Sequence, residues 1–227
     1  MRIRGKDKVP GLLAQAADLL IDPETWSGPP DNAAGAQSDA KSGGRFTRQF
    51  MEVGCGRGAF VCTLAARQPG DWFIAVDKYT PIVARAAALA VERKLTNIRF
   101  FDGDLEQLRS VVPPRSLDGI YLNFSDPWPR RRNERKRLTH GRLLEIYQSW
   151  LKPGGFLEFK TDNEEFYTWS VQSLARAGWD LAREERGLPA SPPPERADEA
   201  AFIQTEYEAK FRAQNLAIYH LRAMPRA

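Results

Sequence analysis

The strongest constraint on the fold of this chain is an alternation of short apolar runs with longer helix-like segments. Runs short enough to be buried strands lie at residues 46–53, 72–76, 97–101, 117–123 and 156–160. Segments 81–94 and 142–151 instead place apolar side chains on one helical face. Such alternation predicts an α/β fold with a mostly parallel central sheet covered by helices on both faces.

Two polar stretches suggest how the chain is organised. Residues 27–44 are rich in Gly, Ala, Ser and Pro without apolar periodicity, which indicates a flexible loop. We therefore expect a basic N-terminal segment and loop at 1–45 and one folded domain at 46–227, a length that fits a single domain. The proline-rich stretch 189–195 predicts an exposed linker or insertion.

Composition argues against export and membrane insertion. No apolar stretch approaches the roughly 18 residues of a membrane span. The apolar segment at 9–13 is too short for the apolar region of a signal peptide, and it contains Pro10 and Gly11. The two cysteines, Cys55 and Cys62, provide no disulfide framework and suit a reducing compartment. We expect a cytoplasmic protein without a membrane association, and with only two histidines we expect no metal site.

Acidic residues recur near the ends of the first four predicted strands. In a parallel sheet, ligands bind beyond the carboxyl ends of the strands, and the acids at these positions are Glu52, Asp77, Asp104 and Asp126. Any one of them could be a solvated loop residue or a helix N-cap. Four at equivalent positions favour a binding site.

A glycine-rich loop follows the first strand. Gly54, Gly56 and Ala59 match the dinucleotide pattern, and Asp77 lies about 20 residues further on, where NAD enzymes bind the ribose. Glu52 lies directly beside this loop and would repel a pyrophosphate, whereas a cationic ligand such as S-adenosylmethionine tolerates a carboxylate. The loop therefore favours S-adenosylmethionine as cofactor, and an NAD-dependent oxidoreductase is the alternative.

The third strand offers two candidates for contact with an adenine. The carboxylate of Asp104 could accept a hydrogen bond from the exocyclic amine, and Asp102 is the rival for this role.

A rigid motif and a basic run follow the fourth strand. In Asp126-Pro127-Trp128-Pro129, two prolines restrict the backbone around Trp128. Trp128 is a candidate surface for base stacking, or it packs against its neighbouring prolines. The run RRRNERKR at 130–137 concentrates six cations while the whole chain carries a net charge of only +4. This favours a nucleic-acid contact over a solvated loop or a localisation signal.

These residues together resemble a known family. The segments EVGCGRG, YLNFSDPWPRRRNERKRLT, FKTDNEEFY and TEYEAKF resemble the bacterial tRNA (guanine-N7)-methyltransferases, over about residues 50–221. The resemblance implies the Rossmann-like fold of methyltransferases that use S-adenosylmethionine. It also implies the reaction, which is methyl transfer to N7 of guanine 46 in the tRNA variable loop. It implies tRNA as partner, and the sequence indicates no obligatory protein partner.

The resemblance also implies roles for individual residues. The cofactor would be bound by Glu52, Gly54, Gly56, Asp77, Asp104 and Asp126, and Asp126 is also the implied catalytic residue. The substrate would be bound by Arg130, Asp162, Thr205, Glu206, Tyr207 and Glu208. The RNA-contact segment would comprise Arg132, Arg135, Lys136 and Arg137. Arg130 stands where the family commonly has lysine, which keeps the charge and changes the geometry.

The chemistry of guanine limits what these residues must do. N7 carries a lone pair and no proton, so its attack on a methyl group needs no general base, and catalysis relies on positioning and electrostatics. We expect Asp126 to orient the base, and Asp126 and Asp162 to accept hydrogen bonds from guanine N1–H and its amine. The tetrad at 205–208 lies in a helix-like segment, 201–215, whose aromatic residues could equally be core. A non-catalytic RNA-binding module is a further alternative.

Overall fold

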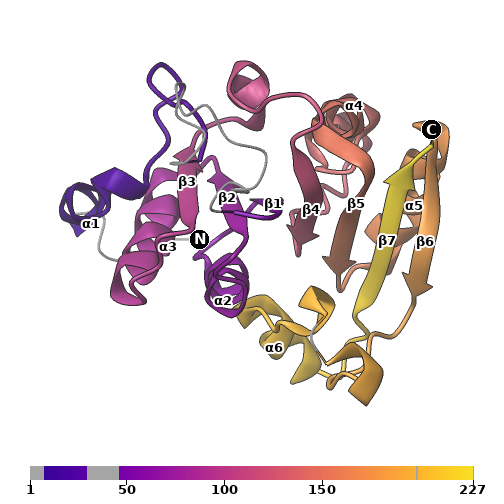
Figure 1. The fold of residues 1–227 in the computed structure, drawn as a ribbon. Helices are drawn as coiled ribbons and strands as arrows, with labels where there is room; N and C mark the ends of the chain where they lie inside the picture. The colour runs from indigo at the N-terminus through magenta and orange to yellow at the C-terminus, as the bar shows by residue number, and fades with distance from the viewer. Residues whose placement is uncertain (1–7, 30–45, 198, 227) are drawn as a thin grey trace. The chain divides into compact units, whose positions relative to one another are not determined.

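The computed structural model describes residues 8–29, 46–197 and 199–226, and the chain divides into two compact units, Met1–Ser116 and Leu117–Ala227. Figure 1 gives the helices and strands of both units. The predicted basic opening and most of the predicted loop at 27–44 lie outside the described residues. The domain boundary predicted at residue 45 stays a prediction.

The first unit alternates strands with helices. Its strands β1 (Gln49–Val53), β2 (Trp72–Asp77) and β3 (Ile98–Asp102) are parallel and run in the order β3-β2-β1. Helix α2 (Ala59–Arg67) connects β1 to β2, and helix α3 (Thr80–Glu92) connects β2 to β3. The 3-10 helix η4 (Leu105–Ser110) follows β3. The strand and helix predictions for this part of the chain are confirmed to within a few residues.

The close packing of α2 on α3 explains why small residues stand at Gly58 and Ala86. Gly58 has φ of 78°, and a Cβ atom placed on it would lie 2.9 Å from the Cβ of Ala86 in α3. Any other residue at position 58 would therefore be strained in its backbone and would also clash.

Residues 9–21 belong to the first unit, which the sequence did not reveal. Helix α1 (Val9–Gln15) packs on α3, and the 3-10 helix η2 (Ala17–Leu19) follows it. The backbone N–H of Ile21 donates to the carbonyl of Phe100 at 2.8 Å. This segment therefore extends the hydrogen bonding of β3.

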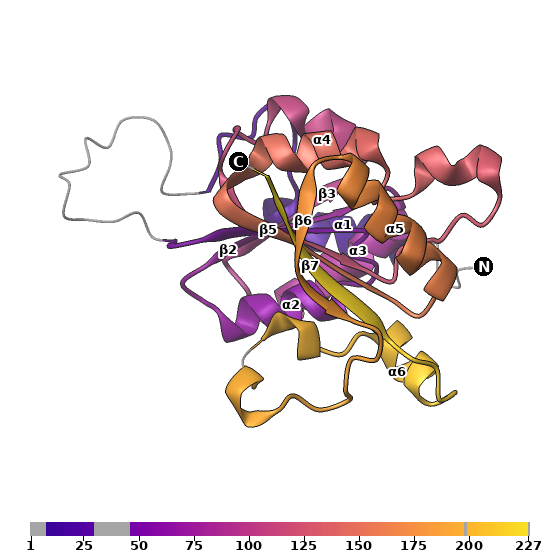
Figure 2. The same ribbon diagram turned by 90° about the vertical axis from the view of Figure 1, so that its right-hand side faces the viewer.

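The second unit has a mixed sheet. Its strands β4 (Leu117–Asn123), β5 (Leu151–Thr161), β6 (Trp179–Glu185) and β7 (Tyr219–Pro225) run in the order β4-β5-β7-β6. Strands β4 and β5 are parallel, while β7 is antiparallel to both β5 and β6. Helices α4 (Gly141–Trp150) and α5 (Glu164–Arg176) contact each other, and α5 packs along β5, β6 and β7 (Figure 2). Together with the first unit, these strands confirm the mostly parallel α/β class.

The segment between β6 and β7 differs from the prediction of one helix at 201–215. It contains the 3-10 helices η6 (Pro194–Arg196) and η7 (Ala200–Phe202), then the short helix α6 (Glu206–Arg212). The helix is short because the chain is extended at Thr205, whose side chain caps α6. Figure 1 shows α6 beyond the carboxyl end of β5.

The helices of the described residues are all too short or too polar to cross a lipid bilayer.

Candidate active site

The glycine loop after β1 is folded back onto the end of β2. The N–H groups of Gly54 and Cys55 both donate to the carbonyl of Val76, at 2.8 and 3.0 Å. Gly54 and Gly56 have φ of 77° and 54°, a region that favours glycine. A Cβ atom on Gly56 would meet no other atom within 4 Å, so the space above this residue is open. A ligand could therefore approach the backbone closely here.

Asp77, the last residue of β2, is fixed beside this loop. Its Oδ2 accepts from the N–H of Gly56 and its Oδ1 from the N–H of Tyr79, each at 3.1 Å. Burial raises the pKa of Asp77, and these backbone hydrogen bonds oppose the shift. Each carboxylate oxygen keeps further acceptor capacity, which is what binding of a ribose diol requires.

Glu52 adds a second carboxylate to the same region. It lies within β1 and is only 2% exposed. Burial raises the pKa of the Cys55 thiol, and the nearby charges of Glu52 and Asp77 raise it further. Both acids therefore act on the loop electrostatically, and the loop is a better environment for a cation than for a pyrophosphate.

The side chain of Asp104 is the N-cap of η4. Its Oδ1 accepts from the N–H of Glu106 at 3.0 Å, while its own N–H donates to Oε1 of Gln107 at 3.1 Å. Asp104 is exposed, and the rival Asp102 is the register partner of Asp77 on the neighbouring strand. The capping alternative for Asp104 thus has direct structural support, and its contact with the cofactor stays a prediction.

In the second unit, the motif after β4 forms a constrained loop. Phe124 and Trp128 have φ of 51° and 42°, values that are uncommon for residues other than glycine. Asp126 is exposed, and Trp128 is half-buried with Nζ of Lys136 4.6 Å from its ring centroid. The stacking surface proposed for a base is thus covered in part by a lysine from the basic run.

The six cations of the basic run do not share one environment. Exposed side chains belong to Arg130, Arg131, Arg132, Arg135 and Lys136, in and beside the 3-10 helix η5 (Arg131–Lys136). Arg137 is buried, with Nε donating to the carbonyl of Pro127 at 2.9 Å and Nη2 to that of Trp128 at 3.1 Å. The sequence grouped Arg137 with the other cations as an RNA contact, but the structure gives it protein partners.

Asp162 follows β5 directly and precedes α5. Burial raises its pKa. The next residue, Asn163, caps α5 by accepting from the N–H of Phe166 at 2.7 Å. The capping fixes the start of α5, so the backbone that carries Asp162 is well defined.

The four residues at 205–208 divide into two pairs. Thr205 caps α6 by accepting from the N–H of Glu208 at 3.0 Å, and Glu208 is buried in an ion pair with Lys160. Glu206 is exposed and Tyr207 is 50% exposed. In the structure, then, Thr205 and Glu208 shape the segment, while Glu206 and Tyr207 are accessible to a substrate.

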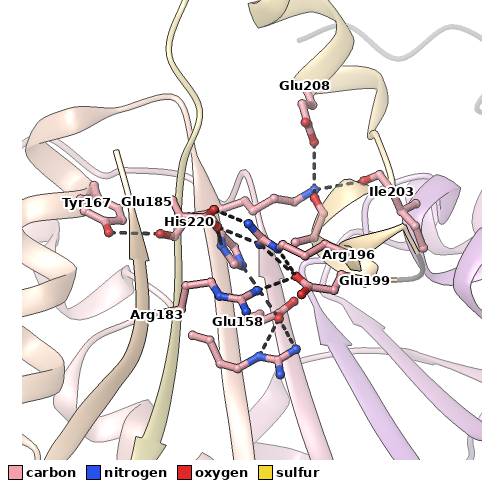
Figure 3. A network of polar contacts seen from close by, with 12 residues as sticks. Glu158, Tyr167, Arg183, Glu185, Arg196, Glu199, Ile203, Glu208 and His220 are labelled. Atoms are coloured by element: carbon pink, nitrogen blue, oxygen red, sulfur yellow. Dashed lines mark hydrogen bonds and ion pairs between the residues drawn. The ribbon is translucent and has the colours of Figure 1, made fainter. Parts of the chain in front are cut away.

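The sequence predicts no role for Lys160, which the structure shows to be a buried structural residue. Its Nζ donates to the carbonyls of Ala201 and Ile203, both at 3.0 Å, and to Oε2 of Glu208 at 2.9 Å (Figure 3). The available signal was a lysine at the end of the apolar strand FLEFK, a position where a charge needs a partner.

An ion-pair network attaches the proline-rich stretch to the sheet (Figure 3). Arg196 binds Glu185 of β6 at 2.6 Å and Glu199 at 2.9 Å, and His220 of β7 lies 2.7 Å from Glu185. The hydrogen bonds that Arg196 donates to Glu185 and Glu199 raise its pKa. The segment that follows the proline-rich stretch is thus held on the sheet, and the choice between a linker and an insertion stays a prediction.

Within the parts of the chain that the structure describes, no three His, Cys, Asp or Glu side chains gather as a metal site requires.

Comparisons of sequence agree on the class of protein. A family model described as "Putative methyltransferase" matches residues 47–221. The tRNA (guanine-N(7)-)-methyltransferase of Halalkalibacterium halodurans is 33% identical over 224 residues, covering 98% of this chain and 95% of that protein. The tRNA (guanine-N(7)-)-methyltransferase of Latilactobacillus sakei is 35% identical over 227 residues, covering 98% and 99%.

Comparisons of structure agree on the fold. A 16S rRNA methyltransferase, KamB, has a TM-score of 0.58 at 15% identity, covering 80% of this chain and 90% of that one. A SAM-dependent methyltransferase from Aquifex aeolicus has a TM-score of 0.55 at 15% identity, covering 79% and 83%. These likenesses confirm the predicted Rossmann-like methyltransferase fold.

Proposed function

Since the chain belongs to the family of bacterial tRNA (guanine-N7)-methyltransferases, we propose that it methylates N7 of guanine 46 in the variable loop of tRNA. It is an S-adenosylmethionine-dependent methyltransferase. The observation that carries the proposal best is the joint presence, in one chain, of the acidic glycine loop and the exposed basic run beside Asp126.

The residues of the first unit fit S-adenosylmethionine. Bound there, the cofactor would supply an electrophilic methyl group on a sulfonium. We assign Glu52 and Asp77 to its binding, because one is a buried carboxylate near the loop and the other is fixed with spare acceptor capacity. Gly54 and Gly56 would allow close approach of the cofactor to the backbone, and Asp104 remains a proposed contact near the adenine.

The second unit would bind and orient the guanine. Because N7 already presents a lone pair, we propose that Asp126 acts by orientation and electrostatics, and also contacts the cofactor. Together with Asp162 it would accept hydrogen bonds from N1–H and the amine, groups that distinguish guanine from adenine. Trp128 would be a stacking surface for the loosened base.

The remaining contacts would hold the tRNA. We propose that Arg132, Arg135 and Lys136 bind phosphates, because their exposed side chains concentrate positive charge beside Asp126. Arg130, Glu206 and Tyr207 are exposed and are proposed to touch the substrate directly. Thr205 and Glu208 would contribute through the shape of the segment. A tRNA substrate also supports the proposal that the protein works in the cytoplasm.

The decisive experiment is methyl transfer from labelled S-adenosylmethionine to an unmodified tRNA transcript by the purified chain alone. Borohydride reduction and aniline treatment then cleave the RNA at N7-methylguanosine. We expect cleavage at guanine 46 only, which would also support activity without a protein partner. Cleavage elsewhere would contradict the position, and binding of the cofactor without any transfer would favour a non-catalytic RNA-binding module.

A further inference from the structure

Arg137 differs from the other cations of the basic run in its accessibility. It is 7% exposed, whereas Arg135 and Lys136 directly before it are exposed. A side chain that neutralises an RNA phosphate must reach the surface. Arg137 is therefore poorly placed to contact RNA, although the sequence groups it with residues that are well placed.

The guanidinium of Arg137 instead binds the loop that carries Asp126. Nε donates to the carbonyl of Pro127 at 2.9 Å and Nη2 to that of Trp128 at 3.1 Å. These two carbonyls belong to the residues that follow Asp126. Because the guanidinium is planar and rigid, two adjacent hydrogen bonds define the orientation of both peptide groups.

The backbone at this point needs such support. Trp128 has φ of 42°, a left-handed conformation that a bulky residue adopts only where its surroundings impose it. The carbonyl of that same residue accepts one of the two hydrogen bonds from Arg137. The hydrogen bond is therefore made at a residue whose backbone conformation is unfavourable by itself.

The guanidinium also packs on aromatic residues of α5. Its Cζ lies 4.3 Å from the ring centroid of Trp169 and 5.8 Å from that of Phe166. Both aromatic residues belong to α5, the helix that begins just after Asp162. Arg137 thus connects the loop of one proposed guanine-binding acid to the helix that follows the other.

We propose that Arg137 is a positioning residue, which holds the Asp126 loop against α5 and so sets the placement of Asp126 for methyl transfer. This inference rests on the proposed function and assigns Arg137 a role in the rate of transfer instead of in RNA affinity. It separates Arg137 from Arg132, Arg135 and Lys136, which act through phosphates.

The test compares Arg137→Lys with Arg135→Ala. Lysine keeps the charge, and so preserves a phosphate contact, but it cannot reproduce a planar fork stacked on Trp169. Single-turnover transfer at saturating tRNA and cofactor is measured together with the tRNA dissociation constant at several salt concentrations. For Arg137→Lys we expect a rate lower by roughly 100-fold, the effect typical of small misplacement, with the salt dependence of binding unchanged. Arg135→Ala should weaken binding and reduce the salt slope by about 0.7 to 0.9.

A second variant covers the case in which Arg137→Lys fails to fold, which thermal denaturation and cofactor binding would reveal. Trp169→Leu removes the stacking and leaves both hydrogen-bond acceptors in place. It should also lower the rate without changing the salt slope, and its effect should not add to that of Arg137→Lys, because both act through one contact. Full activity of either folded variant, or additive reductions in rate, would overturn the inference.

The wild-type chain in the same assay separates the two proposals. An active wild type with an equally active Arg137→Lys overturns only the positioning role. A wild type that methylates no guanine at N7 overturns the proposed function, and the inference with it.

Discussion

Nζ of Lys160 lies 2.9 Å from Oε2 of Glu208, and the two side chains are only 2% and 3% exposed. The other carboxylate oxygen of Glu208 accepts from Arg212 at 2.7 Å, and the remaining ammonium donors of Lys160 go to backbone carbonyls of 201 and 203. Both charges are therefore compensated inside the protein. The pair attaches α6 to the end of β5, and it accounts for Glu208 without a direct contact to substrate.

Breaking this pair should destabilise the protein strongly. Lys160→Met removes the ammonium donor of Glu208 Oε2 and of the carbonyls of Ala201 and Ile203, while Arg212 still binds Glu208 Oε1. We therefore expect a decrease of about 3 kcal/mol in the free energy of unfolding, the lower end for a broken buried pair. Urea denaturation measures it. The control is Lys152→Met, whose pair with Asp118 is 36% and 25% exposed and should contribute no more than about 1 kcal/mol. Equal effects of the two substitutions would contradict the structural role of Lys160.

The network around Glu185 should make the stability depend on pH in the acid range. Burial raises the pKa of Glu185, but hydrogen bonds to Arg196 and His220 outweigh it, so the pKa lies below its ordinary value of 4.5. A depressed carboxyl pKa means that the folded state binds the proton less readily than the unfolded state. The stabilisation is therefore present above pH 4.5 and is lost as the pH falls through the lower, folded value.

Glu185→Gln should remove this part of the pH dependence. Thermal denaturation of wild type and variant between neutral pH and pH 3 tests it, and we expect the curves to converge as the pH decreases. Glu195→Gln, an exposed glutamate in the same unit, is the matched control. A constant difference between Glu185→Gln and wild type at every pH would show that the network does not act through the charge of Glu185.

Substitution of Asp104 can separate its cap from its proposed contact with the cofactor. Serine retains an N-cap acceptor, so Asp104→Ser should keep the stability close to that of wild type. If the carboxylate contacts the adenine, calorimetry should give an affinity for S-adenosylmethionine that is lower by about tenfold, the value of one hydrogen bond. Unchanged affinity would restrict Asp104 to capping and would make Asp102 the next candidate.

The basic run should control the salt dependence of tRNA binding. Replacing Arg132, Arg135 and Lys136 by alanine should flatten the plot of log affinity against log salt by roughly 0.7 to 0.9 for each phosphate that the protein no longer neutralises. Filter binding at several salt concentrations measures the slope. Arg176→Ala, an exposed arginine on α5, should leave the slope as in wild type. If the triple variant kept the wild-type slope, the basic run would not contact the phosphates of the tRNA.

Asp126→Asn should slow methyl transfer by about 100-fold or more at saturating substrates, if the carboxylate stabilises the cationic purine. Affinity for tRNA should change far less. Because N7 needs no deprotonation, the wild-type rate should be nearly independent of pH around neutrality. A steep dependence that disappears in Asp126→Asn would instead indicate proton transfer by this residue.

The parallel part of the fold could be predicted because buried parallel strands are continuous apolar runs. β2 has this character up to its final aspartate, and β1 and β3 are mostly apolar, with a glycine or an acid where each strand ends. Strand β6 does not, since after the buried Trp179 its positions alternate between exposed and half-buried, and WDLAREE contains four charged residues. Its pairing with β7 depends on contacts between segments distant in sequence, and a local pattern does not reveal those.

The same distinction applies to the site. The chemistry of Asp77 follows from its place after a strand and near a glycine loop, and the structure confirms that place. The roles of Lys160 and Arg137 could not be predicted in this way. Lys160 finds its partners 41 to 48 residues further along the chain. Arg137 is one cation among several in the same basic run, so nothing in the local sequence separates it from its exposed neighbours. Only its packing against α5 does so.

The buried thiol in the glycine loop has a chemical consequence for an enzyme of this class. Only the thiolate form of cysteine is a strong nucleophile, and burial together with Glu52 and Asp77 keeps the pKa of Cys55 well above its ordinary value. Cys55 therefore stays protonated at neutral pH. A thiolate in this loop would compete with guanine for an electrophilic methyl group and would inactivate the protein by alkylating itself. Burial, assisted by the carboxylates proposed to attract the cofactor, thus keeps this thiol in its unreactive form.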